Sequence, residues 1–136
     1  MMRKFPKVAD VVDDSEKTRT KALQALRTVL ENAAKAGADT VELEYGGDNR
    51  LDVSYMFGDT GAGGTLITRE LEWKVIQIIV EKARLKNRCC GTMEMELLGE
   101  RRSILVHEYE SFGESAFRLI LRPRRKSKQY RGADAE

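Results

Sequence analysis

The architecture is set by two runs of alternating apolar and polar residues, Val41-Glu42-Leu43-Glu44-Tyr45 and Leu51-Asp52-Val53-Ser54-Tyr55-Met56-Phe57. Alternation with a period of two is typical of strands that bury one face and expose the other to water. The residues between the runs, Gly46-Gly47-Asp48-Asn49, are typical of a turn. The two runs therefore predict an antiparallel β-hairpin.

Helices are predicted on either side of this hairpin in the sequence. The first spans about Ser15 to Ala36, because apolar residues recur along one helical stripe at Leu23, Leu26, Leu30 and Ala33. Asp13 offers a capping oxygen before it, and Gly37 offers a left-handed stop after it. The second helix spans about Thr68 to Lys86 and has a broad apolar stripe. This breadth predicts burial against the sheet on one side and against the first helix or a partner chain on the other.

The rest of the chain is typical of strands. Apolar residues alternate with polar ones up to Leu97, a turn is predicted at Gly99, and two more strands are predicted over residues 104–109 and 116–121. Pro123 ends the sheet because it has no N–H to donate. The predicted order is α-β-β-α-β-β-β, an α+β fold in two layers with a largely antiparallel sheet and two helices. Residues 1–12 form an extension, 13–122 one domain, and 123–136 a basic, flexible tail.

Composition favours a globular protein, with 41% hydrophobic and 34% charged residues in a chain of 136. The net charge of +2 is unevenly distributed: from Arg122 onward there are six basic and two acidic residues, which leaves 18 basic and 20 acidic residues elsewhere. No apolar stretch is long enough to span a bilayer, and no apolar block follows the first basic residues. We therefore expect a cytoplasmic protein without membrane insertion.

A glycine-rich segment, Gly58 to Thr65, follows the second strand and precedes the second helix. Gly58, Gly63 and Thr65 have the spacing of a phosphate-binding loop, but Gly64 stands where such a loop needs its lysine. Without that ammonium group, the segment has little means of stabilising charge in phosphoryl transfer. We expect a flexible loop here, and a protein that is not an enzyme.

The sequence contains one histidine, His107, and two adjacent cysteines, Cys89 and Cys90. No nucleophile or oriented carboxylate accompanies His107, so a packed or sheet-face histidine is expected. Two cysteines provide neither a disulfide framework nor a four-ligand zinc set. They are expected to be buried under the end of the second helix, with a reactive thiol as the alternative because Arg88 is close. No catalytic residue, cofactor site or metal site is expected.

Between residues 36 and 121, short motifs occur in a recognisable order: Ala38-Asp39, Gly91, Gly99 with Arg101, and Gly113-Glu114 with Arg118-Leu119-Ile120. In this order and spacing, the chain resembles the PAS-like domain that precedes the motor in type II secretion and type IV pilus assembly ATPases. The resemblance implies a PAS-like fold without a motor. In that family, arginines of this domain contact nucleotide phosphates held by the motor. This chain has other residues at the matching positions, which implies that those contacts are lost: Asp52, Ser54, Met56, Thr92, Ile104 and Val106.

These observations together predict a non-catalytic interaction or regulatory module that docks to another protein or to itself. The expected surface is the apolar side of the second helix at Trp73, Ile76 and Val80. One alternative is nucleic-acid binding through the basic tail, by Arg122, Arg124, Arg125, Lys126, Lys128 and Arg131. A second alternative is a small-molecule sensor with a pocket between the sheet and the helices.

Overall fold

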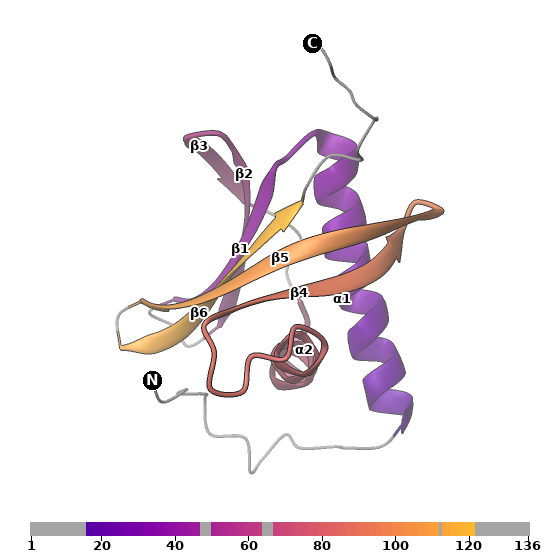
Figure 1. Ribbon diagram of the computed structural model, residues 1–136, viewed down its shortest axis with the longest axis vertical. Coiled ribbons are helices and arrows are strands. Elements are labelled where there is room, and N and C mark those ends of the chain that lie inside the picture. Colours follow the sequence, from indigo (N-terminus) through magenta and orange to yellow (C-terminus); the bar gives the residue numbers. More distant parts are fainter. Residues whose placement is uncertain (1–15, 47–49, 64–66, 112, 122–136) are drawn as a thin grey trace.

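The computed structural model describes residues 16–46, 50–63, 67–111 and 113–121, and shows two helices and a six-stranded sheet in an α+β arrangement (Figure 1). The elements are, in order, α1 (Glu16–Ala36), β1 (Thr40–Tyr45), β2 (Leu51–Phe57), β3 (Thr60–Gly63), α2 (Arg69–Lys82), β4 (Cys90–Leu97), β5 (Glu100–Ser111) and β6 (Glu114–Leu121). None of the helices in these ranges is both long and apolar enough to cross a membrane.

The strands lie in the order β3-β2-β1-β6-β5-β4, and every neighbouring pair is antiparallel. Hairpins connect β1 to β2, β2 to β3, β4 to β5 and β5 to β6. The two halves of the sheet meet where β6 pairs with β1, with Val41 opposite Leu119 and Leu43 opposite Phe117. Because this contact joins residues far apart in sequence, it makes the two halves one domain.

Both helices pack on the same face of the sheet (Figure 1). Side chains at alternate strand positions, such as Leu43, Met93 and Ile104, point to this face and are buried. Leu26 of α1 and Ile79 of α2 lie in the same core, and the two helices also contact each other. No helix of the described residues covers the opposite face, so its side chains remain partly exposed.

The structure confirms the hairpin, the first helix and the α+β class, adds a strand that the predicted order lacked, and corrects the end of the second helix. Part of the glycine-rich segment is a strand, since β3 pairs with β2 and places Gly63 opposite Ser54. Glycine has low strand propensity, so local sequence gave no signal for it. The second helix ends at Lys82, four residues before Lys86, because Arg84 adopts a left-handed φ of 56°.

Candidate functional site: a basic depression beside a thiol–imidazole cluster

The chain between α2 and β4 reverses direction within a few residues. The N–H of Arg84 donates to the Glu81 carbonyl (3.2 Å) and the N–H of Leu85 donates to the Val80 carbonyl (3.0 Å), which satisfies carbonyls at the helix end. Leu85 is fully buried, whereas Arg84 and Lys86 on either side are exposed. The turn is therefore anchored in the core at Leu85 and directs its cations outward.

Gly91 holds the next part of this segment against the helix end. A Cβ atom at Gly91 would lie 2.0 Å from the Ala83 carbonyl oxygen, so only glycine fits at this approach. The N–H of Arg88 donates to the Leu85 carbonyl (2.9 Å), and the Cys89 carbonyl accepts from the N–H of Glu108 (2.8 Å). These contacts fix the backbone from the end of α2 to the start of β4.

A surface depression of about 620 Å³ lies along this segment, lined by Val80, Glu81, Arg84, Lys86 and Arg88. Glu81 pairs with Arg19 of α1 at 3.1 Å. In the part of the chain that the structure describes, no carboxylate forms an ion pair with Arg84, Lys86 or Arg88. The depression therefore carries an excess of positive charge beside one apolar side chain. We call it the basic depression.

The residues predicted to form a docking surface on α2 are differently placed. Ile76 is fully buried, so it presents no side chain to a partner, which corrects that part of the prediction. The broad apolar stripe of α2 is explained by α1, which packs against α2. The sequence alone allowed either α1 or a partner chain at this surface. Trp73 and Val80 are half-buried, and Val80 lines the basic depression. The tail cations from Arg122 onward lie outside the described residues.

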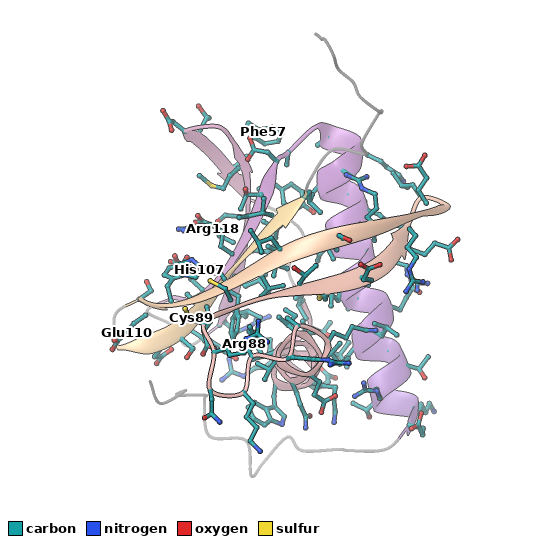
Figure 2. The ribbon with its side chains drawn as sticks, in the orientation of Figure 1. Phe57, Arg88, Cys89, His107, Glu110 and Arg118 are labelled. Carbon is teal, nitrogen blue, oxygen red and sulfur yellow. The ribbon has the colours of Figure 1, made fainter. Side chains whose placement is uncertain are left out.

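A second group of chemically active side chains lies directly after the basic depression. Cys89 and Cys90 are exposed, so the prediction that they are buried was wrong. Their Sγ atoms are 3.8 Å apart, and Cys90 is paired across the sheet with His107. Figure 2 shows Cys89 close to His107. The two sulfur atoms and a ring nitrogen of His107 all lie within 4.8 Å of one another. We call these three residues the thiol–imidazole cluster.

Next to the thiol–imidazole cluster, the uncovered sheet face carries a group of paired side chains. Arg118 lies opposite His107, but its Nε donates to Glu42 (3.0 Å) and its guanidinium stacks over the Tyr109 ring at 4.7 Å. The hydroxyl of Tyr109 donates to Glu44. Partial burial and this hydrogen bond to a carboxylate raise the pKa of Tyr109 well above its usual range. These groups hold one another and offer no free acid or base.

The thiol–imidazole cluster was not identified from the sequence, although the turn predicted at Gly99 could have located it. Leu98 and Gly99 have φ values of 53° and 81°, which makes them a two-residue turn of the type that matches strand twist. Such a turn sets the register, with Leu97 opposite Glu100. Counting outward from that pair places Cys90 opposite His107.

Compared with models of known protein families, the chain matches none, and no curated protein matches it significantly in sequence.

Proposed function

We propose that this chain is a non-catalytic docking module of the cytoplasm that binds an acidic segment of a partner protein in the basic depression. The observation that carries the proposal is that three cations, Arg84, Lys86 and Arg88, line the same depression as Val80 and form no ion pair with a carboxylate of the described residues. Apart from the tail, the chain has a small acidic excess, so this positive region is local. Complementary charge of this kind steers a partner and fixes its orientation.

The backbone of the segment gives further support. Arg84 and Asn87 both have left-handed φ values, of 56° and 63°. Arg84 adopts this conformation at a cost of about 1 kcal/mol, whereas asparagine adopts it more readily. Strained backbone of this kind tends to occur at functional sites. Here the conformation turns three alternate cations to the surface while Leu85 stays in the core.

A protein is favoured over a nucleic acid as the partner. Nucleic-acid sites present basic residues along the whole length of the phosphate backbone. The basic depression has three cations, an apolar side chain and the carboxylate of Glu81 in its wall. That mixture suits a peptide whose carboxylates alternate with apolar residues.

The proposal includes descent from the PAS-like domain of the secretion and pilus ATPases. Its support is the position of the motif glycines. Gly99 and Gly113 have φ values of 81° at hairpin turns, and Gly91 is at the close approach to Ala83. These are positions where glycine is required, so the same glycines would be needed in any domain with this backbone.

The test is fluorescence anisotropy with two labelled probes of equal negative charge, a peptide of alternating glutamate and leucine and a single-stranded oligonucleotide. We expect the purified chain to bind the peptide more tightly at low salt. The triple variant Arg84→Glu/Lys86→Glu/Arg88→Glu should lose about tenfold or more in affinity, because it replaces attraction by repulsion. All three residues are exposed, so the fold should be retained.

A matched control makes the same change of charge elsewhere. Lys17→Glu/Lys21→Glu/Lys35→Glu alters three exposed lysines of α1 and should leave peptide binding nearly unchanged. Equal losses in both triple variants would mean that net charge alone drives binding, and would contradict the proposal. Tighter binding of the oligonucleotide would instead favour nucleic acid as the partner.

A further inference from the structure

Three soft or borderline metal ligands meet at the start of β4. The N–H of Glu108 donates to the Cys89 carbonyl, so Cys89 and Glu108 are a hydrogen-bonded pair of the ladder. The next pair, Cys90 and His107, is therefore a pair without hydrogen bonds between its two backbones. Residues in such pairs have the closest side chains in an antiparallel sheet, with Cα atoms about 4.5 Å apart. Cys89 precedes the strand and turns its sulfur toward that of Cys90.

The sulfur spacing matches that of a tetrahedral metal site. Two thiolates bound to zinc at about 2.3 Å each lie about 3.8 Å apart. The Sγ atoms of Cys89 and Cys90 are 3.8 Å apart without any metal-imposed movement. The ring nitrogen of His107 lies within 4.8 Å of both, so a small side-chain rotation brings it to the third corner.

We propose that Cys89, Cys90 and His107 bind a single Zn²⁺ ion and leave the fourth coordination position open. Thiolate and imidazole ligands select Zn²⁺ or Cu⁺ over Mg²⁺ and Ca²⁺, which require oxygen ligands. All three side chains are at the surface or half-buried, so an ion can reach them. On binding, each thiol releases its proton to solvent, and no electron is transferred.

The backbone that carries the three proposed ligands is already held in place before a metal binds. Cys89 is held through its carbonyl, Cys90 begins a strand and His107 lies within β5, so binding orders little additional backbone. Of the described residues, two cations lie near the cluster: Arg88, which directly precedes Cys89 in the chain, and Arg118, which is opposite His107 and is engaged by Glu42 and Tyr109. The charge of Arg118 is therefore partly neutralised, while the charge of Arg88 favours the thiolate forms that bind a metal.

Co²⁺ is the probe for the test because its absorption reports both ligand type and geometry. The full chain, reduced and freed of metal, is titrated with Co²⁺, and Zn²⁺ is then added in competition. We expect saturation at one ion per chain, sulfur-to-cobalt charge-transfer bands, and the intense visible bands of four-coordinate cobalt. Zn²⁺ should displace the cobalt stoichiometrically.

Single variants locate the ligands. Cys89→Ser, Cys90→Ser and His107→Gln should each weaken Zn²⁺ binding by more than the roughly 10-fold to 100-fold that loss of an outer-shell partner of a metal ligand costs. Glu110→Gln is the control: it removes an exposed carboxylate at the end of the same strand, outside the cluster, and should bind as the original chain does. Circular dichroism of the metal-free variants checks that each remains folded.

Two outcomes would overturn the proposal. One is cobalt binding without sulfur-to-cobalt bands, which would place the ion elsewhere on the chain. The other is unchanged affinity in folded His107→Gln, which would exclude the imidazole from the site. Neither outcome affects the basic depression, whose test uses no metal.

Discussion

Glu72 is a carboxylate that folding removes almost entirely from water. It is 3% exposed and accepts hydrogen bonds from Arg50 Nε (2.9 Å) and from the N–H of Leu51 (3.2 Å). Arg50 also donates to the Ile67 carbonyl at 3.0 Å. This one buried carboxylate joins the start of β2 to the start of α2, and its hydrogen bonds to these donors offset the cost of its burial.

Glu72→Ala should lower the free energy of unfolding by about 2–3 kcal/mol, because it leaves the buried N–H of Leu51 unsatisfied and removes the carboxylate to which Arg50 Nε donates. Urea unfolding followed by fluorescence of Trp73, the only tryptophan, measures this change. Glu70→Ala changes an exposed acid in the same turn and should alter stability by no more than about 0.5 kcal/mol. Similar losses in the two variants would refute the structural role of Glu72.

We expect the buried hydroxyl of Tyr45 to make the free energy of unfolding depend on pH in the alkaline range. Its hydroxyl is buried and has no hydrogen-bond partner among the described residues. Burial, and next the negative charge of Glu72, raise the pKa of Tyr45 well above its usual range. A raised pKa in the folded state means that stability is complete below about pH 10, the value for an unfolded tyrosine, and is lost as pH rises above it.

Tyr45→Phe removes this loss, because phenylalanine cannot ionise and leaves no unpaired hydroxyl. Its alkaline unfolding midpoint should therefore lie at higher pH than that of the original chain, with stability at pH 7 unchanged or up to about 1 kcal/mol higher. Circular dichroism across the alkaline range measures the midpoint. Identical midpoints for the two proteins would show that Tyr45 does not limit alkaline stability.

At the scale of elements, β4 approaches the end of α2 so closely at Gly91 that no side chain fits there. Gly91→Ala should cost about 1–3 kcal/mol, because its Cβ would lie 2.0 Å from the Ala83 carbonyl oxygen and force the strand away. Gly63→Ala is the matched control, since nothing lies within 4 Å of a Cβ there and its φ is not left-handed. Thermal unfolding compares the two, and equal effects would argue against the close approach.

Helices and strands were predictable from sequence where apolar periodicity or a turn glycine marks them. Periodicity revealed α1 and the β1–β2 hairpin, and Gly99 revealed the β4–β5 turn. β3 was missed because three of its four residues, Gly61, Ala62 and Gly63, have low strand propensity and are ordered by pairing with β2. The end of α2 was missed because Arg84, and not a glycine, takes the left-handed conformation.

The candidate site was less predictable because it depends on long-range arrangement. Adjacent cysteines and one histidine 17 positions later have no spacing that indicates a metal site by itself, and the strand register brings them together. The basic depression depends on where α2 ends, which its sequence did not reveal. The tail, whose charge was evident, lies outside the described residues.

At the scale of the molecule, β6 is the element that unites the two halves. Phe117 of β6 is fully buried, lies opposite Leu43 of β1 and belongs to the single core. Phe117→Ala should cost about 3–5 kcal/mol through lost burial and the cavity left behind. Phe57→Ala, at a side chain that is 36% exposed, should cost much less.

Cooperative unfolding is the measurement at this scale. Trp73 fluorescence reports on α2 and far-ultraviolet circular dichroism on the whole backbone, and in a single domain both follow the same transition. Phe117→Ala should move both curves to lower urea concentration by the same amount. If the curves separated, the halves on either side of the β1–β6 pairing would be independent units.

The two rims of the sheet bear on how the protein behaves when concentrated. At one rim, β4 presents Glu94 and Glu96 on its exposed side; at the other, β3 is only four residues long. Charged side chains on an edge strand and a very short edge strand are both features that hinder a neighbouring molecule from adding its own strands. These two edge strands therefore disfavour the assembly of copies of this chain into fibrils.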